Sequence, residues 1–270
     1  MSKIVLITGC STGIGRDLAE RLTRSGYTII ATARKAESLE NLPAALKLPL
    51  DVTQPKSIQQ AIDIIIQRFG RIDVLVNNAG YAQIGAIEEL SDAQIQRMYD
   101  VNVFGVMRMV RAVVPIMRKQ KAGQIINLSS IAGKMVTPVN GSYSSTKFAI
   151  EAVSDALRLE LEPFNIQVIL IEPGAIKTNF DRTVHTHGDA IINNPTSPYL
   201  ALYRKYQQVS DRMRGKEPGP EAVSEVIQCA MESTNPKARY LVGFPFSGRL
   251  FLHLGGPAWN FAVRQMFKAS

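Results

Sequence analysis

The amino-acid sequence predicts an α/β fold in which helices cover both faces of a parallel β-sheet. Short, almost continuous apolar runs alternate with longer stretches of helical periodicity. Such runs suit parallel strands that are buried on both faces, and their alternation with helices is typical of βαβ units. The runs expected to be strands are residues 4–7, 27–31, 46–50, 74–76, 124–128, 166–171 and 240–242.

The stretches between these runs carry the end signals of helices. Ser91 fits the N-cap of a helix that begins at Asp92, and Gly26 and Gly70 come just after helix ends. The ranges expected to be helical are 14–25, 55–69, 92–118, 143–162 and 220–232. Because no low-complexity linker or internal repeat interrupts the chain, we expect one domain over residues 1–270.

Two segments fall outside this alternation. Residues 179–216 leave the carboxyl end of the sixth expected strand, where ligands of open parallel sheets bind, so we expect them to form a substrate lid. Residues 243–270 are expected to form a C-terminal extension that packs over the substrate mouth or against another subunit. Membrane association is not expected, because Gly255, Gly256 and Pro257 would break a continuous amphipathic helix.

The composition is ordinary for a soluble globular protein, with 46% hydrophobic and 20% charged residues. The formal net charge is +8, but no basic run reaches five residues, so a nucleic-acid partner is not expected. Cys10 and Cys229 are the only cysteines, which fits a reducing compartment. No apolar run of about 20 residues and no signal-peptide pattern occurs, so we expect a cytoplasmic protein.

The first expected strand runs into a turn of sequence Thr-Gly-Cys-Ser-Thr-Gly-Ile-Gly, residues 8–15, that opens a helix. Glycines let the backbone approach a pyrophosphate closely, and a helix N-terminus favours its negative charge. The turn therefore predicts a dinucleotide-binding site; a purely structural turn is the alternative. The residues expected to contact the cofactor here are Gly9, Ser11, Thr12, Gly13, Ile14 and Gly15.

The end of the second expected strand indicates which nicotinamide cofactor binds. A site selective for NAD carries an acidic side chain there, whereas the 2′-phosphate of NADP requires a cation. Arg34 and Lys35 occupy this place, and the first acidic residue after them is Glu37. We therefore expect NADP(H), with NAD(H) as the alternative. The other interpretation of Arg34 and Lys35 is a solvated pair at a strand end.

Two further strand ends belong to the expected cofactor site. Asp51 and Val52 follow the third expected strand, where a carboxylate could accept a hydrogen bond from the adenine amino group. Asn78, Ala79 and Gly80 follow the fourth expected strand. Small residues at this point let a flat cofactor pass close to the backbone.

A tyrosine and a lysine, Tyr143 and Lys147, lie four residues apart in the helix expected over 143–162, so they share one face. A free tyrosine hydroxyl has a pKa of about 10, and a nearby ammonium favours the phenolate. We therefore expect a lowered pKa for Tyr143, which could then move a proton between an alcohol and a ketone. Ser130 follows the fifth expected strand, where its hydroxyl could hydrogen-bond the substrate oxygen.

These motifs, in this order, resemble the classical short-chain dehydrogenase/reductase family. The set comprises the glycine turn, Asn-Asn-Ala-Gly at 77–80, Ser-Ser at 129–130 and Tyr-x-x-x-Lys at 143–147, and the resemblance runs from residue 3 to about 242. It implies a single Rossmann-type, doubly wound domain with a seven-stranded parallel sheet and helices on both faces. It also implies a homodimer or homotetramer built on the helices that begin at Asp92 and Tyr143, and a reaction that needs no metal.

The resemblance further implies the roles of individual residues. Tyr143 would be the acid/base, and Lys147 would lower its pKa and hold the nicotinamide ribose. Ser130 would polarise the substrate, and Asn102 would hold a water in the proton relay. The segment after the sixth strand would contact the carboxamide and phosphates through Pro173, Gly174, Ile176 and Thr178.

The expected function is an NADP(H)-dependent interconversion of a ketone or aldehyde and its alcohol by hydride transfer. The glycine turn and Ala-Thr-Ala-Arg at 31–34 are similar to family members that act on steroids, retinoids and other bulky carbonyls. We therefore expect a bulky, lipophilic small molecule as substrate. Two alternatives stay open: epimerase- or dehydratase-type chemistry on the same fold, and a nucleotide-binding sensor or scaffold without turnover.

Overall fold

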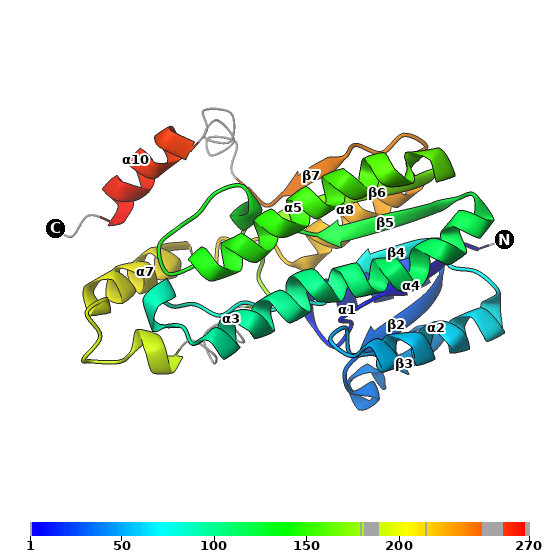
Figure 1. Cartoon of the computed structure of the whole chain (residues 1–270), viewed down its shortest axis with the longest axis horizontal. Helices are drawn as coiled ribbons and strands as arrows, with labels where there is room; N and C mark the ends of the chain where they lie inside the picture. The colour runs from blue at the N-terminus through cyan, green and yellow to red at the C-terminus, as the bar shows by residue number, and fades with distance from the viewer. Residues whose placement is uncertain (1, 179, 181–188, 214, 245–255, 268–270) are drawn as a thin grey trace.

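The computed structural model describes residues 2–178, 180, 189–213, 215–244 and 256–267. In this part of the chain seven strands form one parallel sheet in the order β3-β2-β1-β4-β5-β6-β7 (Figure 1). This order confirms the predicted seven-stranded, Rossmann-type sheet. The strands are β1 (Ile4–Ile7), β2 (Thr28–Ala33), β3 (Leu46–Pro49), β4 (Val74–Asn77), β5 (Gly123–Leu128), β6 (Ile166–Pro173) and β7 (Arg239–Val242).

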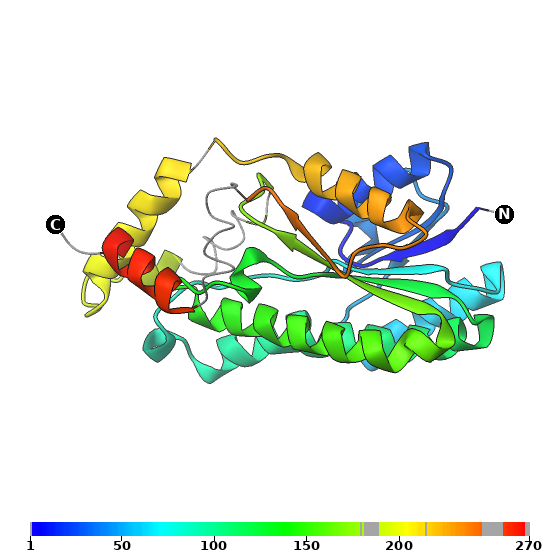
Figure 2. The same ribbon diagram turned by 90° about the horizontal axis from the view of Figure 1, so that it is seen from above.

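Helices cover both faces of the sheet, as Figure 2 shows. One face carries α2 (Pro55–Phe69), α4 (Gly105–Gln120) and α5 (Gly141–Leu161). The other face carries α1 (Gly13–Arg24) and α8 (Pro220–Glu232). Three more helices lie beyond the carboxyl ends of the strands (Figure 1): α3 (Asp92–Tyr99), α7 (Leu200–Met213) and α10 (Gly256–Phe267).

Side-chain alternation along the strands creates two hydrophobic cores. In β1, Ile4 and Leu6 pack toward α2, α4 and α5, whereas Val5 and Ile7 pack toward α1 and α8. Each such buried aliphatic side chain contributes roughly 1.5–3 kcal/mol of hydrophobic free energy. The two cores fix the carboxyl ends of the central strands relative to each other, and the candidate site lies at these ends.

The helix predicted over 92–118 is divided in two. It begins as expected, because Ser91 and Gln94 form a reciprocal capping box at the start of α3. The segment η3 (Asp100–Phe104) is one turn of π-helix, in which the N–H of Gly105 donates to the carbonyl of Asp100. A single extra residue in a turn does not disturb the apolar periodicity enough to be recognised in the sequence.

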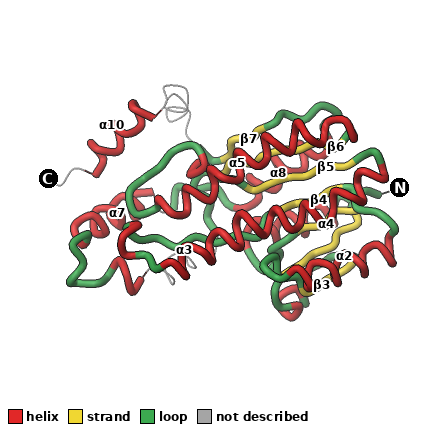
Figure 3. Tube along the Cα trace, viewed as in Figure 1, coloured by secondary structure: helices red, strands yellow, loops and turns green. Residues whose placement is uncertain are grey.

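Two of the helices beyond the strand ends, α7 and α10, form specific hydrogen bonds with the rest of the molecule. In α7, the buried Tyr203 hydroxyl accepts from the N–H of Ala86 at 2.9 Å and donates to the Glu89 carboxylate. Next to α7 lies α10 (Figure 3), and its Trp259 Nε1 donates to the carbonyl of Val136 at 2.7 Å. Among the described residues, no helix is long and apolar enough to cross a bilayer.

The described residues cover only part of the predicted lid and extension. Of the lid, residue 180 and residues 189–213 with 215–216 are described, and positions 179, 181–188 and 214 lie outside the described residues. Of the extension, 243, 244 and 256–267 are described. The lid function and the division into domains therefore stay predictions.

Candidate active site

A cavity of about 620 Å³ opens at the carboxyl ends of the central strands. It lies where the strand order reverses between β1 and β4, which is the usual ligand-binding position in sheets of this topology. Most of the predicted site residues line it: Gly9, Ser11, Thr12, Gly13, Ile14, Arg34, Asp51, Val52, Asn78, Ala79, Gly80, Ser130, Tyr143, Lys147, Pro173, Gly174, Ile176 and Thr178.

The glycine turn between β1 and α1 is shaped to receive a phosphate. Gly9 and Gly13 have positive φ angles of 76° and 60°, and a Cβ on Gly9 would lie 2.9 Å from the Cα of Ala79. The N-cap residue of α1, Thr12, makes no side-chain capping hydrogen bond. The first N–H groups of α1 therefore face the cavity without a side-chain acceptor, and they suit the pyrophosphate of a dinucleotide.

Gly15 has a different place from the one predicted. It is not among the residues that line the cavity. A Cβ on Gly15 would lie 2.5 Å from the carbonyl oxygen of Gly9 and 2.4 Å from Nδ2 of Asn78. The same Asn78 amide donates to the carbonyls of Thr8 and Gly9. Gly15 thus allows the turn to close against α1.

The two cations at the end of β2 differ in their position relative to the cavity. Arg34 lines the cavity, whereas Lys35 does not. Lys35 has an extended backbone, with φ −116° and ψ 119°, so consecutive side chains point in opposite directions. Of these two cations, only Arg34 faces the cavity. On the neighbouring strand end, the Asp51 carboxylate accepts hydrogen bonds from the N–H and hydroxyl of Thr53 and is thereby held at the cavity wall.

Ser130, Tyr143 and Lys147 meet in one part of the cavity. Ser130 is the N-cap of η4 (Ile131–Gly133), and its Oγ accepts from the N–H of Ala132 and lies 3.3 Å from the carbonyl oxygen of Pro173. Tyr143 lies in the first turn of α5, which begins two residues before the predicted start, at Gly141. Lys147 Nζ donates to the carbonyl of Leu128 at 2.7 Å and lies 5.7 Å from the Tyr143 ring centroid.

The protonation behaviour of this trio differs from the expectation. Burial raises the pKa of the Tyr143 hydroxyl above its usual value, and the hydrogen bond with Ser130 offsets only part of that rise. The prediction of a lowered pKa for Tyr143 is therefore wrong for the site as it stands in this structure. Burial lowers the pKa of Lys147 to about 8, although the Glu151 carboxylate acts against this shift. The sequence pattern showed which side chains meet but not how deeply they are buried.

Asn102 is buried in η3 and does not itself line the cavity. Its Oδ1 accepts from the N–H of Tyr81 at 3.0 Å, and its Nδ2 donates to the carbonyl of Tyr81 at 2.8 Å and to Thr146 Oγ1 at 3.1 Å. The side chain is thus fully engaged in joining η3 to the end of β4 and to α5. A water held by Asn102 would have to contact its main chain.

Several cavity residues were not predicted. Phe180 packs beside Tyr143 with 6.0 Å between ring centroids, and the guanidinium of Arg97 lies 5.7 Å from the ring centroid of Tyr81. Ile131, Ala132 and Asn140 also line the cavity. Ile131, Ala132 and Tyr81 directly follow motif residues, so their position in the sequence was a usable signal. Arg97 lies in α3, outside any of the motifs, so the sequence carried no signal for it.

Comparisons with known proteins agree with this site. The family model described as short chain dehydrogenase matches residues 3–188. A 3-ketodihydrosphingosine reductase of Bacteroides thetaiotaomicron is 44% identical over 241 residues, covering 89% of this chain and 88% of that protein.

Two solved structures extend the comparison to complexes with cofactors. A serine dehydrogenase in complex with NADP+ aligns with TM-score 0.77 and 27% identity, covering 88% of this chain and 93% of that one. A short-chain dehydrogenase/reductase from Burkholderia phymatum in complex with NAD aligns with TM-score 0.75 and 26% identity, covering 97% and 92%. The family model spans residues 3–188, and the relatives and solved structures match nearly the whole chain. The chain is therefore an oxidoreductase of the short-chain dehydrogenase/reductase family.

Proposed function

We propose that this chain is an NADP(H)-dependent reductase that interconverts a ketone or aldehyde of a bulky, lipophilic substrate and its alcohol. The observation that carries the proposal is the meeting of Ser130, Tyr143 and Lys147 in the cavity that the glycine turn opens. NADP(H) is preferred because Arg34 lines the cavity directly after β2, whereas the acidic residues of the described wall, Asp51 and Asp100, follow β3 and α3. NAD(H) is the alternative cofactor.

The residues of this chain perform the proton transfer. When bound, the nicotinamide supplies the hydride in the direction of reduction. Tyr143 donates its hydroxyl proton to the substrate oxygen, and the Ser130 hydroxyl hydrogen-bonds the same oxygen as charge develops on it. The Lys147 ammonium stabilises the phenolate left on Tyr143 and would hold the nicotinamide ribose. With a pKa of about 8, Lys147 is mostly protonated at neutral pH.

The remaining assignments follow from the positions of the residues. Pro173, Gly174, Ile176 and Thr178 would contact the cofactor opposite the glycine turn. We propose that Asn102 holds a relay water through its main chain, because its side chain is committed to Tyr81 and Thr146. We also propose a homo-oligomer, because the exposed Phe104 and Phe148 lie on the segments that the family resemblance assigns to the subunit interface. A cytoplasmic location is proposed from the sequence, whose two cysteines fit a reducing compartment.

The wall opposite the cofactor supports a lipophilic substrate. Ile131, Ala132 and Phe180 present apolar surface beside Tyr143. The similarity to a 3-ketodihydrosphingosine reductase extends over nearly the whole chain and points in the same direction. We therefore propose a long-chain ketone as substrate, with 3-ketodihydrosphingosine as the first compound to test.

A substrate panel tests this function. Purified protein is assayed for NADPH oxidation with 3-ketodihydrosphingosine, a steroid ketone, a retinal and a short aliphatic ketone. We expect the highest kcat/KM for a long-chain compound, because each additional buried methylene contributes about 0.8 kcal/mol of binding free energy. Tight NADPH binding without turnover of any carbonyl would instead support a sensor or scaffold. A preference for the short ketone would contradict the lipophilic substrate.

The cofactor preference gives a second prediction. Arg34→Asp should lower kcat/KM for NADPH relative to NADH by at least about tenfold, because a charge-assisted hydrogen bond contributes about 1.5–3 kcal/mol. The matched control is Lys35→Asp, which makes the same charge change at the neighbouring residue outside the cavity. We expect it to alter the ratio by less than about threefold, a long-range effect only. Equal effects of the two variants would rule out a specific clamp at Arg34.

A further inference from the structure

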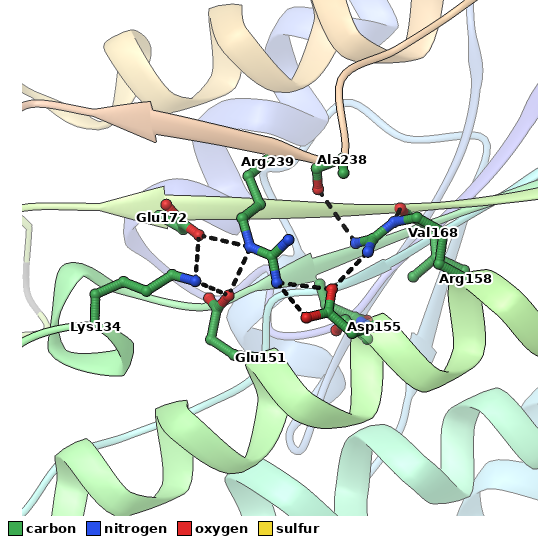
Figure 4. Close-up of polar contacts among 10 residues, drawn as sticks. Lys134, Glu151, Asp155, Arg158, Val168, Glu172, Ala238 and Arg239 are labelled. Atoms are coloured by element: carbon green, nitrogen blue, oxygen red, sulfur yellow. Dashed lines mark hydrogen bonds and ion pairs between the residues drawn. The ribbon is translucent and has the colours of Figure 1, made fainter. Parts of the chain in front are cut away.

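Figure 4 shows a cluster of charged side chains that the proposed reaction does not use directly. We define the charged cluster as Lys134, Glu151, Glu172 and Arg239. Lys134 Nζ lies 2.9 Å from Glu151 Oε2 and 3.6 Å from Glu172 Oε1. Arg239 Nε lies 3.0 Å and 3.3 Å from the same two oxygens. The two cations and the two carboxylates thus come from four different elements: the end of η4, α5, β6 and β7.

Three members of the charged cluster, Lys134, Glu151 and Glu172, lie close in sequence to residues of the candidate site. Lys134 is the C-cap of η4, whose N-cap is Ser130. Glu151 lies one helical turn after Lys147 in α5. Glu172 immediately precedes Pro173, whose carbonyl oxygen contacts Ser130. The charged cluster therefore joins three backbone segments. Two of them carry Ser130 and Lys147, and the third is the end of β6, whose Pro173 carbonyl contacts Ser130.

Close packing makes this attachment stiff. A Cβ on Gly133 would lie 3.1 Å from the backbone of Lys147, so η4 rests directly on α5 at the lysine. At the outer side, Arg239 also binds the Asp155 carboxylate at 2.6 Å, and Arg158 binds Asp155 and the carbonyls of Val168 and Ala238. These outer contacts hold Arg239 in place against α5.

Stability alone does not explain such a cluster. The side chains of Glu151 and Glu172 are only 8% and 6% exposed. Removing charges from water costs free energy, and buried ion pairs can often be replaced by apolar residues without loss of stability. In addition, Glu151 Oε1 is buried without a hydrogen bond within the described residues. A role in the reaction accounts for keeping these charges beside the site.

The electrostatics connect the charged cluster to Lys147. Burial lowers the pKa of Lys147, and the Glu151 carboxylate is the charge that raises it again. Burial and the Glu151 carboxylate also raise the pKa of Glu172, against the opposing effects of Lys134 and Arg239. Asp155 and Arg158 of α5 complete the charged groups around Glu151. The charge on Lys147 thus depends on how the carboxylates beneath it are paired.

We propose that the charged cluster consists of positioning residues, which hold Ser130 and Lys147 in reacting geometry and place the Glu151 carboxylate one helical turn from Lys147. This inference rests on the proposed function, because it assigns these side chains a part in the same proton transfer. The members do not touch substrate or cofactor, since none of them lines the cavity. They act through the two site residues that they support.

The first test is Glu151→Gln, which keeps the size of the side chain and removes its charge. We expect kcat at neutral pH to fall about tenfold, the order of loss that follows from slight misplacement of reacting groups. KM for NADPH should stay within about twofold. The alkaline limb of the kcat/KM pH profile should move to lower pH, because Lys147 loses its supporting carboxylate. A ¹³Cε NMR titration of Lys147, assigned with Lys147→Arg, should show a midpoint below the wild-type value, which we expect at about 8.

The second test is Lys134→Gln, at a side chain 30% exposed, where misfolding is not expected. It should also lower kcat, and Lys134→Arg should restore it because the charge returns. The matched control for Glu151→Gln is Asp73→Asn. Asp73 is another buried carboxylate paired with an arginine, Arg71, but it lies at the amino end of β4. Asp73→Asn should lower Tm without changing the pH profile.

The outcomes separate the two proposals. An unchanged Lys147 titration and pH profile in Glu151→Gln would overturn the role of the charged cluster, as would equal kinetic losses in Asp73→Asn at matched Tm. If the wild-type protein turns over no carbonyl, the proposed function fails. The NMR titration, which needs no turnover, still decides whether the charged cluster controls Lys147.

Discussion

Tyr143→Phe should lower kcat/KM for the carbonyl substrate by at least about a hundredfold, the lower end of what a positioned acid or base contributes. The phenylalanine ring would keep the packing against Phe180, which lies 6.0 Å away between centroids. What disappears is the hydroxyl that bonds Ser130 and that donates the proton to the substrate oxygen. A hundredfold loss corresponds to about 2.7 kcal/mol of transition-state stabilisation. Steady-state NADPH oxidation measures the effect.

The control for this variant is Tyr99→Phe. Tyr99 also uses its hydroxyl, donating to Ser145 Oγ at 3.0 Å on α5, but it is outside the cavity. Turnover by Tyr99→Phe should stay within about threefold of the wild type, and both variants should bind NADPH as the wild type does. Tyr143→Phe with more than about a tenth of wild-type turnover would exclude Tyr143 as the proton donor.

Gly9→Ala should weaken NADPH binding by at least about tenfold, which is about 1.4 kcal/mol. At φ 76° an alanine is strained, and its Cβ would lie 2.9 Å from the Cα and 3.1 Å from the N of Ala79, neither of which can move like a flexible side chain. The turn would have to shift away from β4, which changes the phosphate-binding shape. Titration of NADPH fluorescence measures the dissociation constant.

The chain offers a matched control in Gly26→Ala. Gly26 has a similar φ of 84°, but no atom lies within 4 Å of its added Cβ. Both variants should lose about 1–2 kcal/mol of unfolding free energy from the left-handed backbone. Only Gly9→Ala should bind NADPH more weakly. If both variants bound NADPH equally well, the close approach to Ala79 would not matter for the cofactor.

Much of the fold could be predicted because strand burial leaves a strong pattern. All seven predicted runs are strands, and their observed limits differ from the predicted ones by at most two residues, as with β6, which continues to Pro173. The helices 55–69 and 220–232 have the predicted limits. Site residues in ordered motifs could also be predicted, because parallel strands bring their carboxyl ends together at one edge of the sheet.

The remaining features depend on contacts that a local pattern does not contain. In the π-turn at η3, Asn102 bonds Tyr81 and Thr146, and neither partner is near it in sequence. Arg34 and Lys35 are both cations in the sequence. The extended backbone points their side chains in opposite directions, and only Arg34 lines the cavity. The raised pKa of Tyr143 is a consequence of burial by segments from several parts of the chain.

The contact between Trp259 and Val136 gives the molecule a built-in optical reporter. Trp259 is the single tryptophan of the chain, so all indole fluorescence originates where α10 meets the connection between Ser130 and Tyr143. The indole N–H is bonded to a backbone carbonyl of that connection, which makes the emission wavelength sensitive to its displacement. Movements of this connection when a ligand enters the cavity can therefore be followed in solution without attaching a dye.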